Sequence, residues 1–293
     1  MREIVFHPGR KGWPLAVFIH GMGLDVRIWC SPAEARVLGG KYPLSVLLRA
    51  GTSAMTTSFA DLRERGFPVL TWSQGRPAGP IGAAVEELAA LVRAYERYAE
   101  AGLLFICHSR GGLIARKYLE AGEGKVRGVI TLGSPHRGTT LARWAGYVSP
   151  AAALLNRILE SCRGKEVRTA VQRVGSFLAG SGVKELLPGS PFFEGLKDVK
   201  RADAFYLSFG GTNPDLFRIK SLSLPEIAGL ILPDSLIPKE MRAGYGDGLV
   251  SAASSVLPYA DEHRDFPLNH LRLLFDREVR ECLIGRVEAL HAI

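Results

Sequence analysis

The chain has 293 residues, of which 47% are hydrophobic and 9% aromatic. This composition supports one sizeable core and excludes a largely disordered chain. The formal net charge of +8 would suit an anionic surface, but the basic residues are scattered and no nucleic-acid-binding motif is present. We therefore expect a single domain over residues 1–293 that binds no nucleic acid.

The four cysteines, Cys30, Cys107, Cys162 and Cys282, form neither a C-x-x-C pair nor a metal-ligand spacing. We interpret them as mostly reduced thiols, with one disulfide bridge as the alternative. The first residues lack the long apolar run of a signal peptide. No apolar run reaches the roughly 18 residues of a membrane span. These features predict a cytoplasmic protein, unless a leader has been removed.

Short apolar runs alternate with helical patterns along the chain. The expected strands and helices are, in order, a strand at 15–19, a strand at 67–71, a helix at 81–100, a strand at 103–107, a helix at 111–121, and strands at 126–132 and 204–209. In the first helix, apolar residues recur at helical spacing after Pro80, a residue that favours helix starts. This alternation is typical of a mostly parallel sheet with helices on both faces.

Residues 141–200 interrupt the alternation with an apolar stretch of helical character. We interpret this stretch as a helical cap, or lid, inserted over the strand ends. Long insertions within a compact domain are usually functional, which favours this interpretation. An ordinary pair of crossover helices is the alternative.

The segment LLFICHSRGGLIA at 103–115 places Ser109 on a polar turn between an apolar strand and a helix. This is the setting of a nucleophile elbow, in which the serine hydroxyl projects above the sheet edge. Strand and helix approach closely there, so the residues two before and two after the serine must be small. Gly111 meets this requirement, whereas Cys107 stands where glycine is usual. The helix N-terminus beside Ser109 also favours negative charge.

The expected strand at 15–19 runs into a second notable segment, HGMG at 20–23. We expect Gly21 to let the backbone turn, so that the N–H of Met22 points into the site. The N–H of Arg110, directly after the nucleophile, is the other expected donor of an oxyanion hole. We expect His20 to hold this loop together through hydrogen bonds of its side chain.

A serine nucleophile needs a histidine base, and in hydrolases with such an elbow the histidine comes last in the chain. His270 lies in a loop before an amphipathic helix and is the preferred candidate. His263 is the alternative, although its charged neighbours at 261–265 suggest a solvated surface turn. We interpret His136 as structural, and His291 lies in a terminal segment that tends to fray.

The acid that orients the base is expected between the serine and the histidine. Asp247 lies between Gly246 and Gly248 and precedes apolar residues, which suits a tight loop that projects a carboxylate. A simple turn is the alternative, because Asp-Gly is a common turn pair. Asp215 and Asp234 are the rival carboxylates.

Taken together, these segments resemble those of bacterial triacylglycerol lipases, in the same order: HGMG at 20–23, the elbow at Ser109, TLGSPHRGT at 131–139, GDGLV at 246–250 and NHL at 269–271. The resemblance spans about residues 15–275 and implies the α/β-hydrolase fold, with a mostly parallel central sheet, flanking helices and a helical lid after Thr139. It also implies Ser109, Asp247 and His270 as the catalytic triad, with Met22 and Arg110 as the oxyanion donors.

Two positions depart from the lipase pattern. Those lipases often bind calcium through an aspartate two residues after the triad histidine, where this chain has Arg272. They also often carry a cysteine shortly after the Asp-Gly-Leu-Val loop, where this chain has SAASS at 251–255. We therefore expect no metal site and no such disulfide, as in an intracellular relative.

These features predict a carboxylic ester hydrolase of the lipase or carboxylesterase type. We expect it to act on a small-molecule acyl ester or lipid, with transient contact with a lipid interface, and without a cofactor or protein partner. An acyl-thioesterase or lipid deacylase with the same triad is an alternative. A further alternative is a catalytically inactive hydrolase fold that binds acylated ligands.

Overall fold

The computed structural model describes residues 3–36, 44–47, 55–141, 181–216, 218–219, 222–223, 225–226, 233 and 237–291. Its centre is a seven-stranded sheet in the order β1-β3-β2-β4-β5-β6-β9. The strands of this sheet are β1 (Ile4–His7), β2 (Leu15–Ile19), β3 (Val69–Trp72), β4 (Leu103–His108), β5 (Val126–Leu132), β6 (Phe205–Gly211) and β9 (Glu262–Phe266). All neighbouring strands of this sheet run parallel except β1, which pairs antiparallel with β3.

A separate antiparallel pair consists of β7 (Arg218–Ile219) and β8 (Leu222–Ser223). The α-helices of the described residues are α1 (Arg27–Cys30), α2 (Leu44–Leu47), α3 (Ser58–Arg65), α4 (Ile81–Ala94), α5 (Gly111–Glu120), α9 (Ser181–Glu185), α10 (Pro191–Glu194), α12 (Ala252–Ser255) and α13 (Arg277–His291). The short 3-10 helices are η3 (Glu96–Tyr98), η5 (Lys239–Met241) and η6 (Arg272–Leu274).

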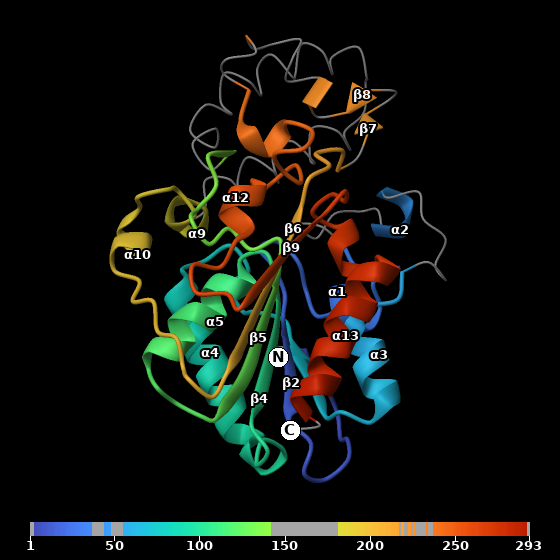
Figure 1. The fold of residues 1–293 in the computed structure, drawn as a ribbon, viewed down its shortest axis with the longest axis vertical. Helices are drawn as coiled ribbons and strands as arrows, with labels where there is room; N and C mark the ends of the chain where they lie inside the picture. Colours follow the sequence, from blue (N-terminus) through green and yellow to red (C-terminus); the bar gives the residue numbers. More distant parts are fainter. Residues whose placement is uncertain are drawn as a thin grey trace.

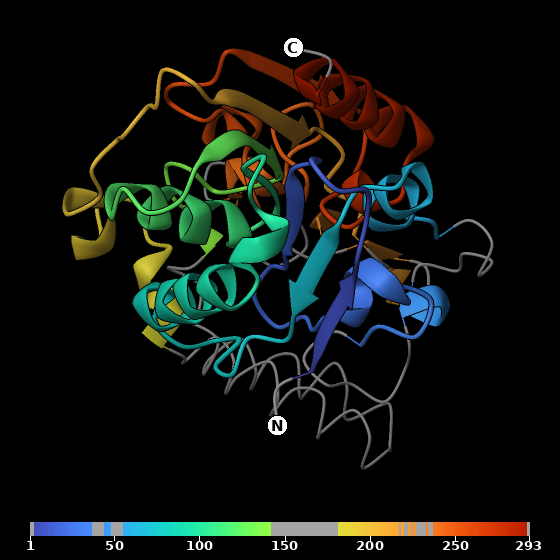
Figure 2. The same ribbon diagram turned by 90° about the horizontal axis from the view of Figure 1, so that it is seen from below.

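Helices cover both faces of the central sheet, with α4 and α5 on one face and α3 and α13 on the other (Figures 1 and 2). Successive side chains of β2 pack on opposite faces of the sheet. Val17 packs into the core against α4 and α5, whereas Ala16 and Phe18 pack into the core against α3 and α13. A parallel sheet buried on both faces needs apolar residues at every position of its strands, which explains the short continuous apolar runs.

The sequence predicts the inner strands and their helices closely. β5 covers the predicted 126–132, and β4 extends the predicted 103–107 by one residue. The predicted helix at 81–100 ends earlier, since α4 stops at Ala94 and the 3-10 helix η3 follows. The mostly parallel sheet with helices on both faces is confirmed.

The interpretation of residues 261–265 as a surface turn was wrong. Most of this stretch belongs to β9, which pairs in parallel with β6 at the edge of the sheet. Its sequence, EHRDF, is charged because an edge strand of this kind is partly open to water. The antiparallel edge strand β1 was not predicted either.

The cap expected at 141–200 lies mainly in residues 142–180, which are outside the described residues. Its C-terminal part forms α9 and α10. The backbone N–H of Thr139 donates to the carbonyl of Leu186 at 2.8 Å. Thr139, which follows β5, and Leu186, which follows α9, are therefore neighbours in space.

Within the described part of the chain, no helix has the length and apolar character required to cross a bilayer. Cys30, Cys107 and Cys282 carry free thiols, and Cys162 lies outside the described residues.

Candidate active site

The turn between β4 and α5 holds Ser109 in a left-handed backbone conformation, with φ of +54°. Among the described residues, no other non-glycine residue has a positive φ. This conformation costs roughly 1–3 kcal/mol for a residue with a Cβ and is concentrated at functional sites. The backbone N–H of Ser109 donates to the carbonyl of Leu132 at 2.9 Å, which fixes the turn to the end of β5.

Small residues after Ser109 allow the helix to approach the sheet. A Cβ at Gly111 would lie 2.4 Å from the carbonyl oxygen of Ile19, and a Cβ at Gly112 would lie 2.3 Å from Ser134 Oγ. Cys107 fits at its unusual position because it pairs in register with Ile19 on β2 and packs into the core beside α4 and α5. The sharp turn is therefore compatible with cysteine in place of glycine.

Asp247 and His270 form a buried pair at the same edge of the sheet. Asp247 Oδ2 lies 2.7 Å from His270 Nδ1, and the side chains are 1% and 2% exposed, respectively. The other carboxylate oxygen, Oδ1, accepts from the backbone N–H of Leu249 at 2.9 Å and of Val250 at 2.7 Å. The backbone N–H of His270 donates to the carbonyl of Asp247 at 3.0 Å. Carboxylate and imidazole are thus held together by both side-chain and backbone contacts.

Gly133, the residue after β5, adjoins this pair. A Cβ at Gly133, where φ is +59°, would lie 3.0 Å from both Asp247 Oδ2 and His270 Nδ1. The pair therefore contacts the end of β5, the strand to which Ser109 is bound. Among the described residues, Ser109 Oγ makes no hydrogen bond.

The loop after β2 lies against the serine from the other side. A Cβ at Gly21 would lie 2.8 Å from the Cβ of Ser109. Within the described part of the chain, the backbone N–H groups of Met22 and Arg110 have no acceptor. Two free N–H groups beside a serine are what an oxyanion site requires.

Several solved structures have a similar architecture. The mature form of the Bacillus licheniformis lipase BlEst2 matches with a TM-score of 0.55 and 18% identity over 97% of this chain and 98% of that chain. Its propeptide form matches with a TM-score of 0.61 and 18% identity, over 97% of this chain but 53% of that one. A structure from work on carboxylesterases of Nitrososphaera gargenis has a TM-score of 0.53 and 14% identity, with 99% and 94% coverage.

The chain has the α/β-hydrolase fold. A family model described as a domain of unknown function, DUF7379, matches residues 81–192. A comparison with curated protein sequences finds no match. At these identities the similarity shows the fold alone, so the chemistry has to be argued from the site.

His20 has the structural role expected for it in this hydrolase fold. Its Nδ1 donates to the carbonyl of Gly21 at 2.8 Å, and its Nε2 accepts from the backbone N–H of Gln74 at 3.2 Å. Burial lowers the pKa of His20 to about 4. A neutral imidazole that both donates and accepts therefore ties the loop after β2 to the loop after β3.

His108, for which the sequence suggested no role, lies against the candidate base. Its Nε2 is 3.1 Å from the backbone carbonyl of His270, and the two ring centroids are 4.7 Å apart. Burial, together with the nearby charge of His270, holds the pKa of His108 well below its usual range. Its position next to Ser109 in the sequence was the available signal.

Besides the candidate residues Ser109, His270 and Asp247, a second Ser–His–Asp chain is present, and its members are joined by hydrogen bonds. His263 Nδ1 lies 2.8 Å from Ser208 Oγ, and its Nε2 lies 3.1 Å from Asp265 Oδ1. Ser208 is fully buried on β6, and its Oγ accepts from the backbone N–H of Leu257 at 3.3 Å. A serine enclosed in this way cannot meet a substrate, so His263 has a structural role there.

The remaining rival residues lie elsewhere. His136 is buried, and its Nε2 is 3.1 Å from Thr131 Oγ1. The backbone carbonyl of Asp215 accepts from Asn269 Nδ2 at 2.6 Å. Asp234 and the side chain of His291 lie outside the described residues.

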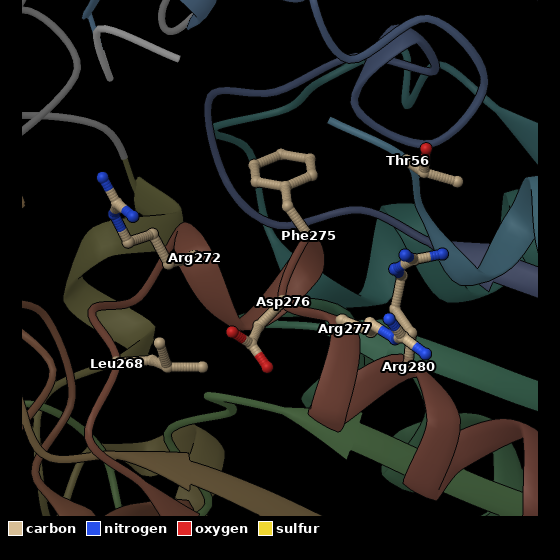
Figure 3. A pocket seen from close by; sticks show the side chains of 7 residues that line it. All are labelled: Thr56, Leu268, Arg272, Phe275, Asp276, Arg277 and Arg280. Carbon is tan, nitrogen blue, oxygen red and sulfur yellow. The ribbon is translucent and has the colours of Figure 1, made fainter. Parts of the chain in front are cut away.

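A pocket of about 330 Å³ opens at the start of α13 and is separate from the candidate triad. Figure 3 shows the residues that line it: Thr56, Leu268, Arg272, Phe275, Asp276, Arg277 and Arg280. Arg280 is held by Asp61, and Asp276 Oδ1 accepts from the backbone N–H groups of the second and third residues of α13. None of Ser109, Asp247 and His270 lines this pocket.

Proposed function

We propose that this protein is a carboxylic ester hydrolase of the lipase or carboxylesterase type, with Ser109 as nucleophile, His270 as base and Asp247 as the acid that orients the base. The observation that carries the proposal is the buried 2.7 Å contact between Asp247 and His270, next to the strained turn of Ser109. Three groups of this kind at the carboxyl edge of one sheet suit acyl transfer through a covalent intermediate.

The assignment of the ring nitrogens follows from the contact with Asp247. Because Nδ1 of His270 donates to the carboxylate, Nε2 is the nitrogen that can accept a proton from Ser109. In the first step Nε2 takes the proton of Ser109 Oγ, while Oγ forms a bond with the ester carbonyl carbon. Asp247 stabilises the imidazolium that results.

The tetrahedral intermediate then collapses. The bond between the carbonyl carbon and the alcohol oxygen breaks, and the proton on Nε2 moves to the departing alcohol. Water attacks the resulting acyl-serine, gives its proton to Nε2, and the proton returns to Ser109 Oγ as the carboxylic acid leaves. His270 is neutral again at the end of the cycle.

The negative charge of each tetrahedral intermediate would be held by the backbone N–H groups of Met22 and Arg110. The support for this role is that both groups lack an acceptor among the described residues, while Gly21 packs directly on Ser109. A donor of this kind contributes roughly 2.7–4 kcal/mol to stabilisation of the transition state.

We further propose that residues 141–200 form a cap that presents an apolar surface to an acyl chain. The attachment of this segment supports the idea. Thr139 Oγ1 donates to the carbonyl of Leu249 at 2.7 Å, and Thr140 N–H donates to Glu240 Oε1 at 2.7 Å. Glu240 in turn accepts from Gly248 N–H through its backbone carbonyl at 2.9 Å. The segment therefore starts beside the Asp247 loop, where a cap could cover the site.

The proposal is tested with Ser109→Ala and the nitrophenyl esters of acyl chains of increasing length. We expect the variant to fold like the wild type and to lose ester hydrolysis and labelling by a fluorophosphonate probe. The matched control is Ser208→Ala, which removes the serine of the second Ser–His–Asp chain and should leave both readouts unchanged. Hydrolysis by Ser109→Ala at the wild-type rate would rule out this nucleophile.

A further inference from the structure

The side chain of Arg110 occupies an unusual place directly after Ser109. The residue is fully buried, yet its guanidinium binds only neutral acceptors among the described residues. Nη1 donates to the carbonyls of Pro77 at 3.1 Å and Gly79 at 2.9 Å. Nη2 donates to Gln74 Oε1 at 3.0 Å. Burial lowers the pKa of Arg110 to about 10, so the group stays cationic at neutral pH.

Two of these acceptors also hold the loop that contains Met22. The carbonyl of Pro77 accepts from Gly23 N–H at 3.4 Å as well as from Arg110. Gln74 accepts from Arg110 and donates through Nε2 to the carbonyl of His20 at 2.9 Å. The guanidinium is thus connected to the residue after Met22 and to the start of the HGMG segment.

The loop at 74–79 and the start of α4 are both hydrogen-bonded to α9. The backbone N–H of Gly182 donates to the carbonyl of Ala78 at 3.1 Å, and Glu185 Oε2 accepts from Ile81 N–H at 2.7 Å. A Cβ at Gly182 would lie 2.3 Å from the carbonyl oxygen of Gly79, so the two backbones are in close contact. The carbonyls that bind Arg110 therefore belong to a loop packed between the elbow and α9.

From these contacts we infer that Arg110 is a positioning residue for the whole oxyanion site. Its backbone N–H is one donor, and its side chain fixes the loop that carries the other donor, Met22. A planar guanidinium can bind Gln74 and the 77–79 carbonyls at the same time, which a single ammonium cannot match. This inference rests on the proposed function and adds to it a residue that aligns both donors.

The test compares Arg110→Met and Arg110→Lys with the wild type. Two quantities are measured: kcat and KM for a nitrophenyl ester, and the inhibition constant of a trifluoromethyl ketone with the same acyl chain. Such a ketone binds serine hydrolases as a charged tetrahedral adduct, and so it reports on the oxyanion site. Removal of a full donor lowers kcat by roughly 100- to 1000-fold. For loss of alignment in Arg110→Met we expect a smaller fall of about 10- to 100-fold in kcat, with KM little changed.

In Arg110→Met we expect the affinity for the ketone to fall by the same factor as kcat. In Arg110→Lys we expect both kcat and ketone affinity to lie between those of Arg110→Met and the wild type. Gln74→Leu should reproduce part of the loss, because it removes the link to His20. If Arg110→Met does not fold, Arg110→Lys and Gln74→Leu carry the same comparison.

The matched control is Arg116→Met, in the helix α5 that begins directly after Arg110. Arg116 is also buried and donates to the carbonyl of His136 at 2.8 Å and to Asp198, away from the HGMG loop. We expect this variant to lose stability without a loss of kcat or of ketone affinity. Arg110 and Gln74 variants that match this control in both readouts would overturn the inference. A wild-type protein that neither hydrolyses the ester nor reacts with a fluorophosphonate would instead refute the proposed function.

Discussion

His108 Nε2 lies 3.1 Å from the backbone carbonyl of His270, and the rings of the two histidines are in contact. The bond to a carbonyl requires the proton of His108 to be on Nε2, and the lowered pKa keeps the ring neutral. A neutral ring can lie beside His270 without repelling the imidazolium that the proposed mechanism forms. The side chain of His108 therefore holds the backbone of His270, the candidate base, in place.

We expect His108→Phe to lower kcat by roughly tenfold, because a lost hydrogen bond of this kind costs about 1–1.5 kcal/mol. KM should change little, since His108 is buried. Steady-state kinetics with a nitrophenyl ester measure both constants. His263→Phe, which disrupts the second Ser–His–Asp chain, serves as the control and should retain wild-type kcat. Equal rates for the two variants would contradict a role for His108.

Gly133 provides a steric test of the Asp247–His270 pair. In Gly133→Ala the new methyl group would lie 3.0 Å from both Asp247 Oδ2 and His270 Nδ1, so the pair must move apart or tilt. Displacement of catalytic groups by even 1 Å can cost about 100-fold in rate, and we expect a loss of roughly this size in kcat/KM. Gly122→Ala is the matched control, because Gly122 has a similar φ of +71° but no atom within 4 Å of its Cβ position. Comparable activity in the two variants would argue against the pair as catalytic groups.

Because several histidines are buried, we expect the free energy of unfolding to decrease in mild acid. Burial lowers the pKa values of His20, His108 and His136 in the folded protein, whereas in the unfolded chain they titrate near 6.5. Below that pH the unfolded chain binds more protons than the folded one, so the free energy of unfolding decreases as the pH falls. For His20, with a folded pKa of about 4, the full effect is on the order of 3 kcal/mol.

Thermal unfolding from pH 7 to pH 4.5 measures this dependence. We expect Tm to fall steadily below about pH 6.5, and the fall to be shallower in His136→Leu, which removes one of the three groups. An equal pH dependence in wild type and His136→Leu would show that His136 does not contribute.

We expect Cys107 to contribute to packing of the core and not to catalysis. Its thiol is fully buried, and burial raises its pKa well above the usual range. Cys107→Gly restores the usual residue of the elbow but removes a buried side chain from the core and loosens β4. We expect a loss of about 1–3 kcal/mol in the free energy of unfolding with unchanged kcat, measured by urea denaturation and by ester hydrolysis. A large loss of kcat with intact stability would point to a chemical role.

The inner sheet could be predicted because each of its strands is buried on both faces, and a short apolar run is then an unambiguous signal. The edge strands β1 and β9 lack this signal, because one edge of each is unpaired and their residues are mixed. The pairing of Asp247 with His270 could be anticipated from chain order and loop character. The contacts of Arg110 and His108 could not be predicted, because they depend on backbone carbonyls of the 77–79 loop and of His270. Every residue has such a carbonyl, so the sequence does not indicate which ones accept a hydrogen bond from a distant side chain.

The hydrogen bond between Thr139 and Leu186 joins two points that lie far apart in the sequence, one after β5 and the other after α9. A connection whose ends already touch can be lengthened, trimmed or exchanged without disturbing the strand on either side of it. If another hydrolase's segment is grafted between these two residues, we therefore expect substrate preference to change while the proposed Ser109, Asp247 and His270 stay in place.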